Sequence, residues 1–309
     1  MNEIDVKFYS LMDIFKNCTY EELLGRIKLN FLTIPEYCQS ILQDYFARFT
    51  FWGSLDVKRG DFKEIELKAL TLKRHYKDFA WLYKRLEDYS SKQLLFAILN
   101  NWYIYDFNSL KKAIDYKYKH YFDFDLIPHC KDEVFVDLGA YTGDSVLDYL
   151  ASYGKDSYKR IYCYDITGEI LDTLKVNLAT LDNIEYRHKA AKDRRGVIYL
   201  DKNTDPSSNR TSTKGKEAVE CVSLDEDIKE KISLIKMDIE GDELSALKGV
   251  KEHIKNDCPK LLISVYHNND HLWQIPRLIY RNNKDYKFFL RYYGGDLYPT
   301  EVVLFALPK

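Results

Sequence analysis

The chain has 309 residues, of which 46% are hydrophobic and 30% are charged, a composition typical of folded globular proteins. This length allows one large domain or two ordinary ones, each with a complete core. The formal net charge of −2 gives no overall attraction to nucleic acid or to an anionic membrane, so we predict no nucleic-acid partner.

No stretch approaches ~18 consecutive apolar residues, so we predict no membrane span. The first residues lack the apolar core of a secretory signal, and we therefore expect a cytoplasmic protein. The cysteines are scattered without close pairs, which argues against a disulfide framework and a structural zinc site. They are Cys18, Cys38, Cys130, Cys163, Cys221 and Cys258.

Residues 1–120 are predicted to form a helical N-terminal domain. Thr19 and Glu22 have the spacing of a capping box, in which each side chain accepts a hydrogen bond from the other residue's backbone N–H group. Pro35 suits the first turn of a following helix. Apolar residues at helical spacing predict three further helices, over residues 62–86, 91–102 and 108–119.

The pattern changes near residue 120, where short apolar runs begin to alternate with amphipathic stretches. This alternation predicts a mostly parallel sheet flanked by helices, as in Rossmann-type α/β folds. Two final runs, 288–290 and 302–305, are separated by a short loop and should pair antiparallel. The predicted strands cover 134–136, 161–164, 184–186, 196–200, 235–237 and 261–266, and the helices 146–153, 170–181, 242–254 and 272–282.

The most informative motif covers residues 134–144. A buried strand ends at Asp137, and a turn bounded by Gly139 and Gly143 opens a helix near Asp144. Glycines let the backbone turn sharply and approach a ligand. Dinucleotide-binding folds prefer G-x-G-x-x-G without a leading acid, whereas this D-x-G-x-x-x-G spacing favours a ligand with an ammonium group, such as S-adenosylmethionine.

Asp165 ends the next predicted strand. A carboxylate there can accept hydrogen bonds from both hydroxyls of a ribose. A single acid at the end of a strand is more often a helix cap. The two features together in one strand–helix–strand unit favour a nucleoside-binding site.

Two later strands also end in polar residues. Asp238 and Glu240 follow strand 235–237, and His267 follows strand 261–266, so all three are expected at the carboxyl edge of the sheet. Asp242 and Glu243 suit the first turn of a helix, where acids interact favourably with the helix dipole. That explanation does not cover Asp238 or Glu240.

These motifs together resemble the FkbM family of S-adenosylmethionine-dependent methyltransferases. The likeness runs from about residue 120 to the end, and its most specific part is IKMDIEGDELSALKGV from Ile235. The resemblance implies a class I methyltransferase fold over residues 121–309, with seven strands and the last one antiparallel. It also implies O-methylation of a sugar, a glycan or a related natural product.

The chain departs from the family pattern at three places. Asp165-Ile166 stands where family members commonly have Glu-Pro, a conservative change for ribose binding. His271 and Tyr292 stand where many members have Asp and His. These last two concern the acceptor side, so the resemblance specifies the cofactor better than the acceptor.

We assign the residues of the cofactor site by their place along the motifs. The first loop should surround the methionine part of S-adenosylmethionine, Asp165 the ribose, and the segment from Lys189 to Ala191 the adenine. The predicted cofactor-binding residues are Asp137, Gly139, Ala140, Tyr141, Thr142, Gly143, Asp144, Asp165, Ile166, Lys189, Ala190 and Asp238.

The acceptor hydroxyl is a poor nucleophile, so a base should assist methyl transfer. We predict His267 as this base, with Asp238 orienting it or acting in its place. In an alternative, Asp238, Glu240 and His267 bind a divalent metal ion that acidifies the hydroxyl.

Two rival functions remain open from the sequence. The first is a catalytically silent methyltransferase-like module that binds a partner protein through its helical domain. The second, a nicotinamide-dependent dehydrogenase, is disfavoured by the glycine spacing. The N-terminal helices would cover the cleft, contact the acceptor or form a homodimer.

Overall fold

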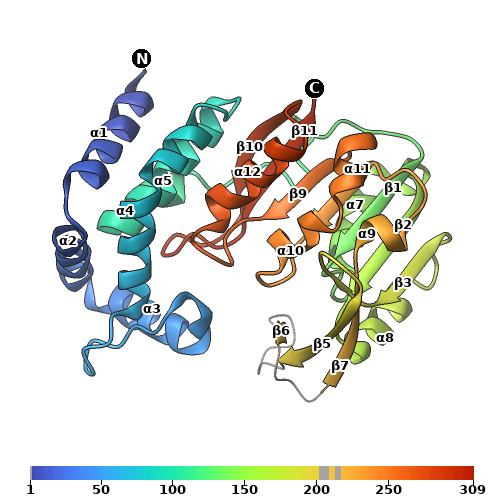
Figure 1. The fold of residues 1–309 in the computed structure, drawn as a ribbon, viewed down its shortest axis with the longest axis horizontal. Coiled ribbons are helices and arrows are strands. Elements are labelled where there is room, and N and C mark those ends of the chain that lie inside the picture. The colour runs from blue at the N-terminus through green and yellow to red at the C-terminus, as the bar shows by residue number, and fades with distance from the viewer. Residues whose placement is uncertain (1, 202–208, 213–216) are drawn as a thin grey trace. The chain divides into compact units, whose positions relative to one another are not determined.

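The computed structural model describes residues 2–201, 209–212 and 217–309 (Figure 1). The chain divides by its internal contacts into two compact units, and the first comprises Met1–Asp115, Val265–Pro276 and Phe288–Val303. The second unit comprises Tyr116–Ser264, Arg277–Lys287 and Leu304–Lys309. None of the described helices combines the length and the apolar character that crossing a membrane requires.

The N-terminal part of the first unit is helical, as predicted, and appears in blue and cyan in Figure 1. The capping box is confirmed, because the Thr19 hydroxyl accepts from the Glu22 N–H group at 3.2 Å and the Glu22 carboxylate from the Thr19 N–H group at 2.8 Å. The helices are α1 (Glu3–Asn17), α2 (Tyr20–Thr33), α3 (Glu36–Arg48), η1 (Thr50–Trp52), α4 (Lys63–Tyr83), α5 (Tyr89–Ile104) and α6 (Phe107–Lys112).

The last of these helices is much shorter than the pattern of apolar residues predicts. The pattern indicates a helix over residues 108–119, but α6 ends at Lys112. The N–H group of Asp115 donates to the carbonyl oxygen of Tyr292 at 2.7 Å instead of continuing the helix. A partner from a distant part of the chain therefore ends the helix, and local sequence does not contain that signal.

The main sheet has seven strands in the order β10-β11-β9-β8-β1-β2-β3. Strand β1 pairs in parallel with β2 and β8, and β2–β3 and β8–β9 are also parallel. Neighbouring strands β10 and β11 are joined by a loop too short for a parallel crossover, so they form an antiparallel pair. The strands are β1 (Glu133–Leu138), β2 (Tyr158–Asp165), β3 (Ile184–His188), β8 (Leu234–Met237), β9 (Lys260–Ser264), β10 (Tyr286–Tyr292) and β11 (Val302–Pro308).

A second sheet has the strand order β4-β7-β5-β6, and the sequence pattern does not predict it. The run 196–200, predicted among the strands of the main sheet, lies here instead and pairs antiparallel with β6 and β7. Its side chains alternate between exposed and more buried positions, which is typical of a sheet with one solvated face. The strands are β4 (Ala190–Ala191), β5 (Gly196–Asp201), β6 (Arg210–Ser212) and β7 (Glu217–Val222).

The helix predicted over residues 242–254 is broken into two. The break lies at Gly249, where the chain passes the end of strand β4. A Cβ atom on Gly249 would lie 1.9 Å from the carbonyl oxygen of Lys192, which follows that strand. The remaining helices are α7 (Asp144–Tyr153), η2 (Lys155–Ser157), α8 (Gly168–Asn177), α9 (Leu224–Asp227), α10 (Glu243–Lys248), α11 (Lys251–Asn256) and α12 (His271–Asn282).

Candidate functional site

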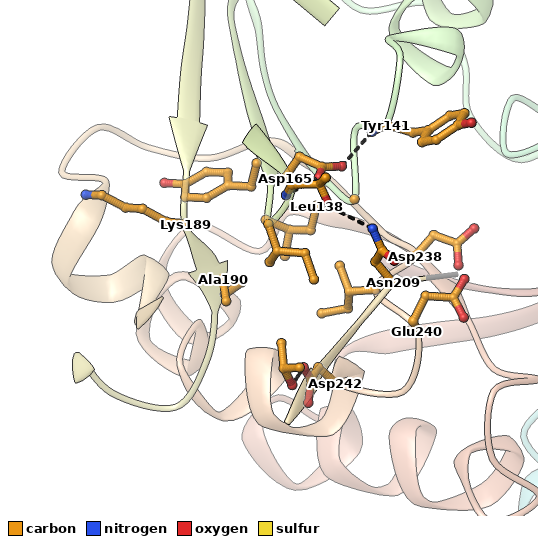
Figure 2. A pocket seen from close by; sticks show the side chains of 16 residues that line it. Leu138, Tyr141, Asp165, Lys189, Ala190, Asn209, Asp238, Glu240 and Asp242 are labelled. Atoms are coloured by element: carbon orange, nitrogen blue, oxygen red, sulfur yellow. Dashed lines mark hydrogen bonds between the residues drawn. The ribbon is translucent and has the colours of Figure 1, made fainter. Parts of the chain in front are cut away.

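A pocket with an empty volume of about 580 Å³ lies in the second unit, at the carboxyl ends of β1, β2 and β8 (Figure 2). This is the edge at which open α/β sheets bind ligands. Its lining residues are Leu138, Gly139, Tyr141, Tyr164, Asp165, Ile166, Thr167, Lys189, Ala190, Ala191, Asn209, Thr211, Asp238, Ile239, Glu240 and Asp242.

Gly139 brings two of the predicted motifs into contact. Its φ angle is +77°, and a Cβ atom there would lie 1.9 Å from the carbonyl oxygen of Asp238. Any other residue would therefore push the loop after β1 away from the loop after β8. Gly143, with φ of +91°, caps α7 and packs closely against Leu174. Both glycines are required by geometry, in agreement with their spacing in the motif.

Asp165 is held at the pocket by two backbone donors. The N–H group of Tyr141 donates to Oδ2 at 3.1 Å, drawn as a dashed line in Figure 2, and the N–H group of Thr167 donates to Oδ1 at 2.8 Å. Burial raises the pKa of Asp165 to about 6, against the lowering effect of these two hydrogen bonds. Each carboxylate oxygen can accept more than one hydrogen bond, so Asp165 can still bind ligand hydroxyls.

Asp137 lies behind the pocket wall and does not belong to its lining. The side chain is fully buried, accepts from the Ser145 hydroxyl at 2.6 Å and lies 3.1 Å from the Lys236 amino group. Lys236 also donates to the carbonyl oxygen of Gly139 at 2.7 Å. Asp137 thus stabilises the glycine turn through Lys236, and its contact with a ligand stays a prediction.

Four other residues predicted at this loop are also missing from the described lining of the pocket: Ala140, Thr142, Gly143 and Asp144. Ala140 is fully buried, and the carbonyl oxygen of Thr142 accepts from the Asn177 side chain at 2.8 Å. Asp144 is exposed in the first turn of α7. Gly139 and Tyr141 are the residues of this loop that reach the pocket.

The loop after β8 carries three carboxylates into the pocket, on Asp238, Glu240 and Asp242. Figure 2 shows the carboxylates of Asp238 and Glu240 beside each other. Glu240 has a left-handed backbone with φ of +55°, a conformation that non-glycine residues adopt mainly where surrounding contacts hold it. The buried Glu243 side chain supplies such a contact by accepting from the Ile239 N–H group at 3.1 Å.

Lys189 lines the pocket but directs its amino group elsewhere. This group donates to Asp227 at 2.7 Å, and the Tyr164 hydroxyl donates to the other oxygen of Asp227 at 2.6 Å. In Figure 2 the Lys189 amino group points away from the other labelled side chains. The pocket wall predicted at Lys189 to Ala191 is therefore formed mainly by small alanine side chains.

Sequence reasoning missed Asn209 and Thr211, which line the pocket from the short strand β6 and the residue before it. The Asn209 amide donates to the Thr167 hydroxyl at 3.1 Å. Thr211 hydrogen-bonds to Asp242, which also pairs with Lys192. Serine, threonine and asparagine dominate this part of the sequence and resemble a loop, so no local pattern indicates a pocket wall.

His267 belongs to the first unit, whereas Asp238 and Glu240 belong to the second. The histidine is 3% exposed, and its ring centroid lies 4.2 Å from that of Tyr266. The carbonyl oxygen of Tyr266 accepts from the Trp52 indole at 2.9 Å. His267 is thus a buried histidine next to an anchored residue, and its catalytic and metal-binding roles stay predictions.

Comparison with known proteins adds a family match. Residues 137–294 match the model of the methyltransferase FkbM domain. A methyltransferase FkbM from Methylobacillus flagellatus is 25% identical, with a TM-score of 0.65 over 80% of this chain. The chain spans 63% of the length of that protein. The search of curated proteins gives no match.

Two more distant solved structures also match parts of this chain. One is an rRNA methylase from Streptococcus thermophilus, with 14% identity and a TM-score of 0.39 over 58% of this chain and 88% of its own. The other is Aeropyrum pernix fibrillarin with bound S-adenosyl-L-methionine, with 10% identity and a TM-score of 0.39 over 59% and 69%. At these TM-scores, neither structure supports a conclusion about this chain.

Proposed function

Because the chain belongs to the FkbM methyltransferase family, we propose that it is an S-adenosylmethionine-dependent O-methyltransferase. Its acceptor is a hydroxyl group on a sugar, a glycan or a related natural product. The main support for the proposal is the position of the Asp165 carboxylate at the carboxyl end of β2. It lines a pocket that also contains apolar side chains.

The pocket residues suit the three parts of S-adenosylmethionine. Asp165 accepts hydrogen bonds from the ribose hydroxyls, the same interaction by which dinucleotide folds bind a ribose. Ile166, Ala190 and Ile239 provide apolar surface for the adenine ring. The methionine part lies toward Gly139 and Asp238, where carboxylates attract its ammonium and sulfonium charges.

Methyl transfer is an in-line displacement in which the acceptor oxygen attacks the methyl carbon as the carbon–sulfur bond breaks. Most of the rate enhancement comes from holding the oxygen and the methyl group within ~3–3.5 Å of each other. A base takes the hydroxyl proton, and His267 is our candidate, with Asp238 orienting it or replacing it. The products are the methyl ether and S-adenosylhomocysteine.

In a second version of the mechanism, a divalent cation takes part. Asp238 and Glu240 offer the carboxylate oxygens that hard cations prefer, and His267 would be the third ligand. A bound cation would lower the pKa of the acceptor hydroxyl. This version makes activity depend on the metal.

The cofactor assignment is tested by isothermal titration. S-adenosylhomocysteine should bind at micromolar concentration, and Asp165→Ala should weaken binding by roughly 1.5–3 kcal/mol, the contribution of hydrogen bonds to a charged group. Asp172→Ala, an exposed change on α8, is the matched control and should leave affinity unchanged. Binding of NAD without binding of S-adenosylhomocysteine would overturn the proposal. Affinity for neither would favour the silent partner-binding module.

The base is tested with His267→Ala. Turnover should fall by ~10²–10⁴-fold, the usual contribution of a general base, while affinity for S-adenosylhomocysteine stays the same. His129→Ala changes an exposed histidine and serves as the control. If a chelator abolishes wild-type activity, the metal version is favoured. A mutant with near-normal turnover, together with no response to chelator, removes His267 from the chemistry.

A further inference from the structure

The Asp238 carboxylate in the pocket is held by Tyr121, a residue outside the sequence motifs. The hydroxyl group of Tyr121 donates to Oδ2 of Asp238 at 2.6 Å. The same hydroxyl lies 3.2 Å from the hydroxyl of Ser264, at the end of β9. Tyr121 is 4% exposed. A short hydrogen bond from a buried donor to a carboxylate is among the stronger polar contacts in proteins.

The backbone around Tyr121 is fixed by packing. Tyr121 has φ of +70°, a left-handed conformation that is unfavourable for a large side chain and persists where the surroundings hold it. The N–H group of Phe122 closes the turn on the carbonyl oxygen of Lys119 at 3.0 Å. The Phe122 ring packs against the rings of Tyr149 and Tyr153 of α7. Tyr121 is therefore anchored by its neighbour in a position it would not adopt by itself.

The ring of Tyr121 also covers the buried cation behind the pocket. The Lys236 amino group lies 5.4 Å from the ring centroid, within the range of a cation–π contact. Lys236 in turn contacts Asp137 and the carbonyl oxygen of Gly139. Tyr121 thus touches both the charged group that supports the glycine turn and the carboxylate that enters the pocket.

We propose that Tyr121 is a positioning residue that fixes the Asp238 carboxylate in the orientation it presents to the methyl donor. The proposal rests on the function proposed above. The terminal torsion of an aspartate is broad and roughly two-fold, so an unheld carboxylate must be ordered when ligand binds, at a cost in affinity. By holding the carboxylate before ligand binds, Tyr121 removes that cost. Tyr121 lies outside residues 137–294, the segment that matches the family model.

The test is a double-mutant cycle on affinity for S-adenosylhomocysteine. Tyr121→Phe keeps the ring and removes the hydroxyl, and it should weaken binding about tenfold. In an Asp238→Asn background the same change should have little further effect, because the charged acceptor is gone. Tyr286→Phe is the control, since it also removes a buried hydrogen bond, from the Tyr286 hydroxyl to the carbonyl oxygen of Pro259. That contact does not reach the pocket, and affinity should be unchanged.

Equal affinities of the Tyr121→Phe and Tyr286→Phe variants for S-adenosylhomocysteine would overturn the proposal, as would full additivity of Tyr121→Phe with Asp238→Asn. Wild-type protein that fails to bind S-adenosylhomocysteine would instead count against the proposed function. In that case the same cycle is measured on the unfolding equilibrium in urea. If the effects of the two changes on the unfolding equilibrium constant differ from additivity by about fivefold or more, Tyr121 holds Asp238. Additive effects on unfolding overturn it.

Discussion

Each of the two units contains a buried lysine paired with an acid, and the two lysines behave differently. In the first unit, Lys68 lies 2.9 Å from Glu64 on the preceding turn of α4, and both side chains are fully buried. In the second unit, Lys236 lies 3.1 Å from Asp137 on the neighbouring strand. Burial disfavours charge in both places.

Different surroundings give these lysines opposite pKa shifts. Burial lowers the pKa of Lys68, and Glu64 compensates only in part. Burial acts on Lys236 too, but Asp137, Asp238 and Asp144 together outweigh it, and the pKa of Lys236 is raised. The pKa of Glu64 is raised by burial, so both partners of the first pair shift toward their neutral forms. Lys236 remains a cation because several carboxylates surround the pocket edge.

The comparison separates an ion pair buried inside a helical core from a cation that supports the edge of the pocket. The Lys68 amino group also lies 4.7 Å from the ring centroid of Tyr105. Because the Lys68–Glu64 pair lies among buried side chains, apolar residues could replace it. Lys236 holds the carbonyl oxygen of Gly139 and supplies the counter-charge of Asp137, so the pocket edge depends on it. Two predictions test this difference, and a third tests the charge of Asp165 in the pocket.

The largest effect is expected for Lys236→Met. This change leaves Asp137 buried without its counter-charge, which should lower the free energy of unfolding by ~3–5 kcal/mol. Affinity for S-adenosylhomocysteine should fall as well, because the glycine turn loses its support. Urea unfolding and isothermal titration measure the two effects. A loss of stability below about 1 kcal/mol would contradict the role given to Lys236.

A smaller effect is expected when both partners of the first-unit pair are replaced, in the variant Glu64→Leu with Lys68→Met. Replacing a buried ion pair by apolar residues of similar volume is often neutral or stabilising by ~1–4 kcal/mol. Urea unfolding should therefore show equal or higher stability, with unchanged ligand affinity. Destabilisation as large as that of Lys236→Met would remove the contrast between the two pairs.

The smallest effect concerns the pH dependence of ligand binding. Burial raises the pKa of Asp165 to about 6, and in the proposed function its ionised form would accept the hydrogen bonds of the ribose. Affinity for S-adenosylhomocysteine should therefore be complete above that pH and fall as pH decreases through it, by about tenfold at pH 5 relative to pH 7.5. Asp165→Asn should bind more weakly and lose this dependence. Equal pH profiles for the two proteins would show that Asp165 does not bind the ligand in its ionised form.

Local patterns predict much of the second unit correctly. Runs of apolar residues indicate β1, β2, β8 and β9, because a strand buried on both faces is apolar along most of its length. Since parallel strands share one carboxyl edge, the order of the motifs alone assigns Asp165 and Asp238 to a common site. In the structure both residues line one pocket, and their roles in binding a ligand stay predictions.

Other site residues cannot be predicted in this way, because their roles depend on partners far away in the chain. The motif assigns Asp137 to the ligand, but Lys236 on another strand occupies its carboxylate. Tyr121 and Asn209 lie in segments without a regular pattern. The resemblance assigns Lys189 to the adenine site, yet Asp227 directs its amino group away.

The sequence by itself determined the order of the elements, the parallel sheet and the edge at which the pocket forms. These follow from backbone hydrogen bonding and from the spacing of apolar side chains, which act over a few residues. Only the tertiary structure decided where each charge is directed. A buried carboxylate must find a counter-charge or a donor, and the elements that supply it, such as β8 for Asp137 and the turn at Tyr121 for Asp238, come together only when the chain folds.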